Sequence, residues 1–148
     1  MVRKLSIRSA LEKERIEEVA RLICEGKVAV IPTDTVYGLA TNPFREEFVA
    51  RIFEIKRRGK KPIPLLVSSR EYVERVAFLT PQAERLMGRF WPGPLTMVLK
   101  RRPETPPIIT CESPGVGVRM PAHDVALAII EKAGGVVTGT SANISGER

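Results

Sequence analysis

Short apolar runs alternate with helical patterns along almost the whole chain, and this alternation is the strongest constraint on the fold. Residues 28–31 form a continuous apolar run, which is typical of a strand covered on both faces. Further strands are expected at residues 5–7, 36–40, 63–67, 95–99, 116–119 and 136–138. Helices are expected at residues 11–25, 45–56, 69–77, 80–90 and 122–132. Strands interleaved with helices predict an α/β protein with a mixed sheet.

Capping residues and breakers mark several ends of these elements. Ser9 is an expected N-cap, and Gly26 is expected to end the first helix. Thr80 followed by Pro81 predicts another helix start, because threonine caps well and proline suits the first turn. The sequence Trp-Pro-Gly-Pro at residues 91–94 predicts a rigid corner, with Trp91 packed beneath it.

Length and charge bound the class of protein. A chain of 148 residues without repeats or a long linker predicts one domain, residues 1–148. Its net charge of +7 indicates an anionic partner, such as a nucleotide, a nucleic acid or a membrane surface; a merely solubilising surface excess is the alternative. No apolar leader or spanning stretch is present, so we expect a cytoplasmic protein with no membrane partner.

Cysteine and histidine positions argue against a metal centre made by the protein. Cys24 and Cys111 lie far apart, and Cys24 falls in a helical pattern, where we expect a small buried hydrophobe. His123 is the single histidine, and a structural role at a helix start is favoured for it. We therefore expect no metal-ligating residues.

Two polar segments follow apolar strands. Residues 138–146, which include Ser141 and Asn143, are mostly small, hydroxyl or amide residues. Such a loop makes a poor core, but its hydroxyls, amide and backbone N–H groups can hold an anion or a carbonyl compound. Residues 32–38 form a similar segment, in which Asp34 and Tyr37 suit turn hydrogen bonds as well as substrate contact.

Basic residues supply candidate anion ligands. Residues 56–61 hold five cations in six positions, which favours a bound phosphate, although a solvated basic loop is the alternative. Arg119 ends an apolar strand, where a guanidinium needs an anionic partner. A ligand and an internal salt bridge satisfy that need equally well, so both remain open.

Common nucleotide and hydrolase motifs are missing from the sequence. There is no G-x-x-x-x-G-K-[ST] loop, and Gly115 and Gly117 lack the third glycine of a dinucleotide fingerprint. Ser141 does not lie in a G-x-S-x-G elbow, which argues against a Ser–His–acid hydrolase. An ATP site would therefore be built from side chains and loops of several strands.

Five segments, taken together, resemble one family. They are Pro-Thr-Asp-Thr-Val-Tyr-Gly-Leu at 32–39, the K-x-R pair Lys56 and Arg58, Trp-Pro-Gly-Pro-Leu-Thr at 91–96, Val-Gly-Val-Arg-Met-Pro at 116–121 with His123, and Thr-Ser-Ala-Asn-Ile-Ser-Gly at 140–146. In this order, and over nearly the whole chain, the sequence is similar to YrdC-like proteins. The resemblance implies an open twisted α/β sheet with a large electropositive cavity.

The resemblance also implies an activity. Members of the family include threonylcarbamoyl-AMP synthases, which form L-threonylcarbamoyladenylate and pyrophosphate from L-threonine, bicarbonate and ATP. Other proteins then transfer the threonylcarbamoyl group to adenosine 37 of tRNA. ATP would be a substrate, with Mg²⁺ bound mainly through its phosphates. A non-catalytic RNA-binding protein, with direct RNA contact, and a carbamoyl-transfer domain are the alternatives.

Site residues follow from the matching motifs. The resemblance implies that Lys56 and Arg58 contact the ATP phosphates, and that Ser141 and Asn143 contact the nucleotide or the threonylcarbamate; these four are the expected catalytic residues. The expected substrate-binding residues are Thr33 and Thr35 on the threonine side, Arg119 on an anionic group, and Tyr37 and Thr140.

The sequence departs from the family pattern in two places. The spacing between Arg58 and Pro64 differs slightly from the family spacing, and Gly59 gives the loop another path. Family domains also continue beyond the last motif, through a further strand and a segment that helps to bind the nucleotide. Because this sequence ends at Arg148, we expect that part of the domain to be absent.

Overall fold

The computed structural model describes residues 3–57, 59 and 61–143, and its elements follow the expected alternation. The helices are α1 (Lys13–Cys24), α2 (Glu46–Lys56), α3 (Pro81–Phe90) and α4 (Asp124–Lys132), with short 3-10 helices η1 (Arg70–Arg75) and η2 (Pro107–Thr110). The strands are β1 (Ala29–Ile31), β2 (Gly38–Ala40), β3 (Leu65–Val67), β4 (Met97–Lys100), β5 (Gly115–Arg119), β6 (Val136–Thr138) and β7 (Thr140–Ser141). The α/β class is confirmed.

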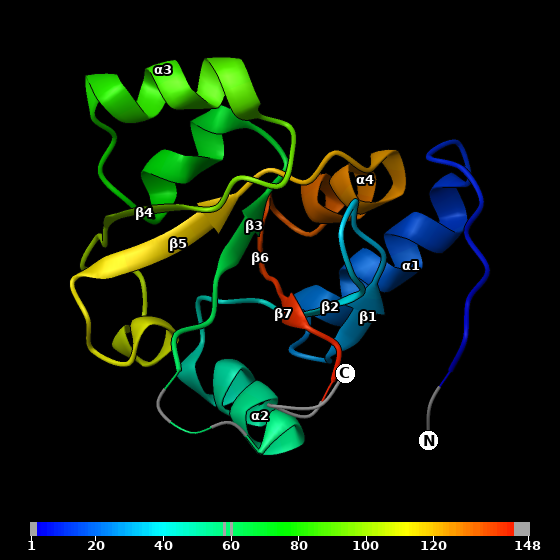
Figure 1. Cartoon of the computed structure of the whole chain (residues 1–148). Helices are drawn as coiled ribbons and strands as arrows, with labels where there is room; N and C mark the ends of the chain where they lie inside the picture. Colours follow the sequence, from blue (N-terminus) through cyan, green and yellow to red (C-terminus); the bar gives the residue numbers. More distant parts are fainter. Residues whose placement is uncertain (1–2, 58, 60, 144–148) are drawn as a thin grey trace.

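The strands divide between two sheets (Figure 1). The larger sheet has the order β4-β5-β3-β6 and is mixed, because β3 runs parallel to β5 and antiparallel to β6. The smaller sheet has the order β1-β2-β7 and is antiparallel throughout. Two segments far apart in sequence, residues 38–40 and 140–141, therefore become neighbouring strands.

Alternate residues of the mixed sheet enter two apolar clusters. Leu65 and Val67 of β3 belong to a cluster that also contains residues of α2, α3 and η2. Leu66 between them belongs to a second cluster, formed with α1 and α4, which lie together on one side of the sheet (Figure 1). Covering both faces explains why β3 is apolar at every position.

A buried threonine joins the two sheets. Thr138, at the end of β6, accepts the N–H of Thr41 at its hydroxyl (3.0 Å) and donates that hydroxyl to the carbonyl of Leu39 (3.0 Å). Its own N–H donates to the carbonyl of Thr41 at 3.1 Å. The next residue, Gly139, donates its N–H to the carbonyl of Pro64 at 2.8 Å. These bonds fix the point at which β7 begins.

Local sequence signals mark two helix starts correctly. The Thr80 hydroxyl accepts the N–H of Ala83 at 3.1 Å, and Pro81 is the first residue of α3. His123 Nδ1 accepts the N–H of Ala126 at 3.2 Å at the start of α4. The structural role expected for His123 is therefore confirmed.

The N-terminal predictions are partly wrong. Residues 5–7 form no strand, and α1 begins at Lys13, with Glu12 rather than Ser9 at the N-cap position. The Glu12 carboxylate instead accepts the N–H groups of Arg8 and Ser9, which lowers the pKa of Glu12 below its usual value. Within the predicted strand, the carbonyl of Ser6 accepts an N–H of the Arg15 guanidinium, which occupies a backbone group that a strand ladder would need.

Cys24 is exposed, so the expectation that it is buried is wrong. The buried stripe of α1 consists of Ile16, Ala20 and Ile23. Cys24 follows Ile23 and is turned away from it by about 100° around the helix. Its thiol contacts the carbonyl of Ala133 at 3.4 Å.

Strand ends and short elements also differ from expectation. Strands β2, β3 and β4 each begin two residues later than predicted, and η2 was not predicted.

Among the described residues, no helix combines the length and the apolar character that crossing a bilayer requires.

Candidate active site

Lys56 brings two distant motifs together. It is the last residue of α2, and only 1% of its surface is exposed. Its ammonium donates to the carbonyl oxygens of Ser141 (2.6 Å) and Asn143 (2.8 Å), which lie 85 and 87 residues further along the chain. The Ser141 hydroxyl and the Asn143 side-chain oxygen each lie 3.3 Å from the same nitrogen. The expected juxtaposition of Lys56 with Ser141 and Asn143 is therefore present.

The serine and asparagine side chains are themselves linked. The Ser141 hydroxyl donates to Asn143 Oδ1 at 2.6 Å. Ser141 is part of β7, which is held in place by its pairing with Gly38 of β2. The described contacts of Lys56 to these residues include both backbone and side-chain oxygens, so the lysine fixes the path of this loop as well as its polar groups.

The chain turns sharply after Lys56. Arg57 has a left-handed backbone (φ 50°, ψ 42°) and ends α2, and its N–H donates back to the Glu54 carbonyl at 3.1 Å. This turn ends the helix directly after Lys56. The expected catalytic residue Arg58 lies outside the described residues.

The loop between β1 and β2 is held by a threonine. The Thr33 hydroxyl donates to the carbonyl of Val36 and accepts the N–H groups of Thr35 and Val36, both at 3.2 Å. The hydroxyls of Thr33 and Thr35 are 3.3 Å apart. Thr33, expected on the threonine side, therefore holds the turn in this structure, and its role in substrate contact stays a prediction.

Arg119 connects three segments. At the end of β5, its guanidinium forms an ion pair with Asp34, and Nη1 donates to the Thr35 hydroxyl at 2.9 Å. Nε donates to the carbonyl of Gly93 at 3.1 Å. Of the two explanations left open for Arg119, the internal salt bridge is thus present, and its contact with Thr35 places it beside the loop expected to face threonine.

The proline corner at residues 91–94 packs against the end of β5 and contacts Arg119. Trp91 is nearly buried, and its indole N–H donates to the carbonyl of Leu95 at 2.8 Å, across the corner. The peptide bond between Trp91 and Pro92 is cis. Gly93 donates its N–H to the carbonyl of Met120 at 2.9 Å. The corner is therefore fixed to the end of β5, and the packing expected for Trp91 is confirmed.

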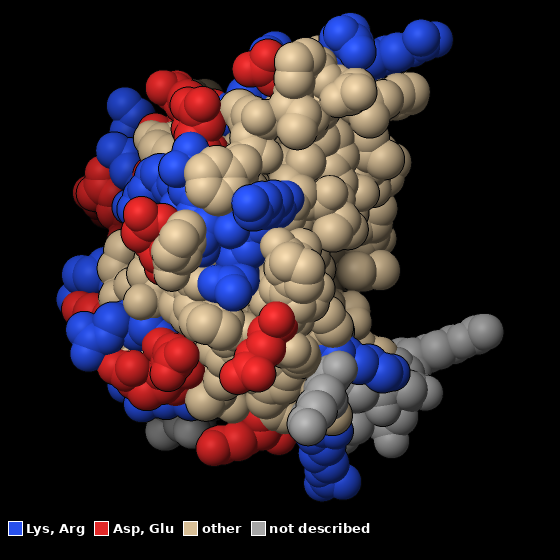
Figure 2. Space-filling view, turned by 90° about the vertical axis from the view of Figure 1, so that its left-hand side faces the viewer, with Lys and Arg blue, Asp and Glu red and all other residues tan. Residues whose placement is uncertain are grey.

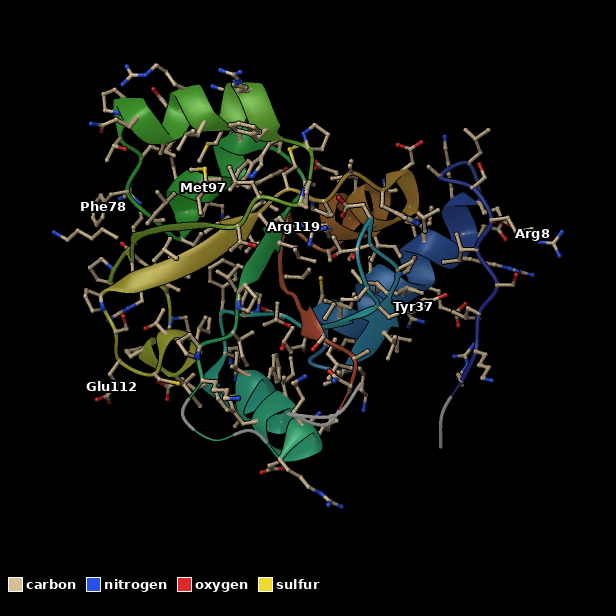
Figure 3. The ribbon with its side chains drawn as sticks, viewed as in Figure 1. Arg8, Tyr37, Phe78, Met97, Glu112 and Arg119 are labelled. Carbon is tan, nitrogen blue, oxygen red and sulfur yellow. The ribbon has the colours of Figure 1, made fainter. Side chains whose placement is uncertain are left out.

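Tyr37 directly precedes β2, and Thr140 lies in the neighbouring strand β7. Thr140 is buried and pairs with Leu39. The Tyr37 side chain is 64% exposed, and its carbonyl accepts the N–H of Ala142 at 2.9 Å. Figure 3 shows Tyr37 beside β1 and Arg119 at the end of β5. Ligand contact by either Tyr37 or Thr140 stays a prediction.

The sequence places Asp34 in a polar turn that suits turn hydrogen bonds as well as substrate contact, but it does not predict the ion pair with Arg119. Two features of the sequence point to this pair. Arg119 ends an apolar strand and needs an anionic partner, and Asp34 is an acid in a polar loop of the same expected site. The separation of 85 residues between the two hides that pairing from local patterns.

The surface carries a basic cluster and a hollow, and neither is tied to the expected site residues by a described contact. Figure 2 shows lysine and arginine side chains gathered in the middle of one face of the molecule, with acidic groups around them. A hollow of about 600 Å³ lies between α2 and η2; its described lining includes Phe53, Ile108 and Glu112 and none of the expected site residues. Within the described ranges, no group of three or more His, Cys, Asp or Glu residues is placed to hold a metal ion. The large electropositive cavity stays a prediction.

The fold is an α/β protein with a mixed sheet, in which Lys56 and Arg119 connect polar loops that are distant in sequence. A family model for Sua5, YciO and YrdC, described as "Telomere recombination", matches residues 21–148. The chain belongs to this Sua5–YciO–YrdC family.

Individual relatives agree with this assignment. The chain is 43% identical over 145 residues to a protein named threonylcarbamoyl-AMP synthase from Pyrococcus abyssi, and the match covers 97% of the chain. A solved structure of a double variant of P. abyssi Sua5 superposes with a TM-score of 0.95 at 42% identity, covering 99% of the chain. P. abyssi Sua5 complexed with L-threonine matches with a TM-score of 0.89 at 45% identity, covering 92% of the chain.

The chain is much shorter than these relatives. It spans 43% of the length of the P. abyssi synthase, and 43% and 41% of the two solved chains.

Proposed function

We propose that this chain carries the catalytic site of a threonylcarbamoyl-AMP synthase, which converts L-threonine, bicarbonate and ATP into L-threonylcarbamoyladenylate and pyrophosphate. The name of the P. abyssi relative supports the reaction, and the L-threonine complex of P. abyssi Sua5 supports the amino-acid substrate. The activity belongs to the nucleotidyltransferase class, because an adenylyl group moves from pyrophosphate to a carbamate oxygen.

The observation that carries the proposal is the contact of Lys56 with Ser141 and Asn143. These residues come from the two motifs expected to be catalytic, and they share one ammonium group across 85 and 87 residues of sequence. A buried charge costs free energy unless hydrogen bonds compensate it, and here carbonyl, hydroxyl and amide oxygens of the second motif surround the Lys56 ammonium. An ordered lysine beside hydroxyl and amide groups suits a site that handles anions.

The chemistry requires positioning more than acid–base catalysis by the protein. Bicarbonate takes up a proton and loses water to give CO2. The threonine amine attacks the CO2 carbon, which forms the N–C bond, and the nitrogen releases a proton to give the carbamate. A carbamate oxygen then attacks the α-phosphorus of ATP, and the bond to pyrophosphate breaks. Cationic groups that hold both anions and offset the charge of the pentacoordinate phosphorus lower the barrier.

Residue roles follow from this scheme. Lys56 and Arg58 neutralise the phosphates, while Ser141 and Asn143 orient the nucleotide or the carbamate. Arg119 pairs with an anionic group of the amino-acid substrate. Thr33, Thr35, Tyr37 and Thr140 complete the substrate side of the site, and Mg²⁺ enters with the ATP phosphates.

The product defines a further step. An acyl adenylate is a reactive mixed anhydride, so a second activity must use it soon after release. We propose that tRNA-modifying proteins take the threonylcarbamoyl group to adenosine 37. The net charge of +7 supports direct RNA contact as an additional property.

Threonine-dependent pyrophosphate release tests the proposal. The protein is incubated with ATP, Mg²⁺, bicarbonate and labelled L-threonine, and pyrophosphate and adenylate are measured. We expect release from the wild type and its loss in Lys56→Ala and Ser141→Ala. Lys132→Ala is the matched control, because the Lys132 side chain is exposed and its ion pair with Glu17 is long, at 3.8 Å.

Two outcomes of the pyrophosphate assay would contradict the proposal. A folded wild-type chain that releases no pyrophosphate, but binds RNA in a salt-sensitive way, would favour the RNA-binding alternative. Pyrophosphate release that survives Lys56→Ala would separate the activity from this site.

A further inference from the structure

Asp34 has no role in the scheme above, although it is the ionic partner of Arg119. Both side chains are mostly buried, with exposed fractions of 16% and 12%. Asp34 is not needed to hold its own turn, because the Thr33 hydroxyl bonds to the backbone of Thr35 and Val36. The carboxylate of Asp34 therefore acts on Arg119 rather than on the loop.

Three acceptors, one for each nitrogen, hold the guanidinium of Arg119. Nε donates to Gly93, Nη1 to Thr35 and Nη2 to Asp34, so each nitrogen has one acceptor. An arginine side chain has five N–H donors in a rigid plane. Among the described residues, one N–H on each Nη atom has no acceptor. These two donors are left for a ligand, and their direction depends on where the three acceptors lie.

We infer that Asp34 is a positioning residue, which holds Arg119 so that its remaining N–H groups meet the carboxylate of the amino-acid substrate. This rests on the proposed function, which gives Arg119 an anionic ligand. The negative charge of Asp34 repels a substrate carboxylate that shares the same guanidinium. Any benefit of Asp34 to substrate binding must therefore come from the place of its acceptor oxygen and not from its charge.

Two substitutions separate position from charge. Asp34→Asn keeps the side-chain length and the Oδ1 acceptor but removes the charge. Asp34→Glu keeps the charge but moves the carboxylate outward by one methylene group. If position matters, the asparagine variant resembles the wild type and the glutamate variant does not; if charge matters, the order reverses.

Calorimetric titration with L-threonine decides between these orders. We expect Asp34→Asn to bind within about threefold of the wild type and Asp34→Glu to bind about tenfold more weakly or worse, since small misplacements at a site are costly. ATP affinity, which does not depend on Arg119 in this scheme, is expected to stay unchanged in both. Strong binding by Asp34→Glu with weak binding by Asp34→Asn would overturn the inference, and so would equal binding by both. Thermal melting confirms folding, and Asp34→Ser, which also withdraws the acceptor, replaces Asp34→Glu if the latter does not fold.

A second readout needs no substrate. The Nε–H of Arg119 donates to Gly93 in the folded protein, so its ¹H–¹⁵N signal should be protected from exchange. We expect that protection to persist in Asp34→Asn and to fall in Asp34→Glu. If the wild type does not bind threonine, the proposed function fails, and this signal still decides whether Asp34 positions Arg119. Unchanged protection in Asp34→Glu would contradict the inference.

Discussion

Replacing either of two neighbouring buried threonines by valine should have opposite effects on stability. Thr138 and Thr41 are both fully buried, and valine matches the shape of threonine. The Thr138 hydroxyl bonds to the N–H of Thr41 and to the carbonyl of Leu39, whereas the Thr41 hydroxyl has no hydrogen-bond partner within the described part of the chain. The same chemical change thus removes two hydrogen bonds at one site and none at the other.

The expected magnitudes follow from these contacts. Thr138→Val leaves a buried N–H and a buried carbonyl without their partner, so the free energy of unfolding should fall by about 2–4 kcal/mol. Thr41→Val removes a buried hydroxyl that gains nothing from burial, so stability should stay constant or rise by about 1 kcal/mol. The melting temperature of Thr138→Val should accordingly fall by roughly 5–15 °C.

Urea unfolding followed by circular dichroism measures both variants against the wild type. Equal slopes against urea concentration are needed for the midpoints to be compared as stabilities. The reasoning is refuted if Thr138→Val lies within about 0.5 kcal/mol of the wild type, which is the usual range of a neutral substitution, or if Thr41→Val is as destabilising as Thr138→Val.

Three further substitutions test other parts of the fold. Lys56→Met should lower the free energy of unfolding by about 2–4 kcal/mol, because charged hydrogen bonds to two carbonyls are lost. Denaturant titration compares this variant with Lys132→Met, and equal effects of the two substitutions would contradict the prediction. Trp91→Phe should cost about 1–2 kcal/mol through the lost indole bond to Leu95, and an unchanged melting temperature would show that this bond adds nothing. Gly26→Ala should lower the free energy of unfolding more than Gly134→Ala does, by about 1 kcal/mol or more. Both glycines have positive φ, but a Cβ at Gly26 would lie 2.3 Å from the Phe48 ring, whereas a Cβ at Gly134 would meet no atom within 4 Å. Equal melting temperatures for the two glycine variants would argue against a clash at Gly26.

Sequence patterns predict best where the cause is local. The Thr80 cap of α3 and the His123 cap of α4 each depend on a side chain and an N–H three residues later. The apolar run of β3 likewise shows both-face burial directly. For such features, nearest neighbours in sequence carry enough information.

Predictions fail where distant residues decide the outcome. Strand β7 has only two residues, and it is a strand because β2 pairs with it. Cys24 was assigned to the wrong face of α1, since its helical pattern did not show which residues α4 would cover. The ion pair of Asp34 with Arg119 was not predicted, because 85 residues separate the two partners.

The contact of Lys56 with Asn143 also affects when during synthesis a ligand can help the protein. The two residues are 87 positions apart, and ribosomes add about 5–20 residues per second, so roughly 4–17 seconds separate their appearance. During that interval the nascent chain already contains the loop of Asp34 and the helix of Lys56, but it has no strand β7 to complete the site. Ligands stabilise only the state that they bind, so substrates cannot stabilise the nascent chain before Asn143 has been added. Substrate added to cells should therefore protect from proteolysis only chains that already contain strand β7, without improving the earlier steps of folding.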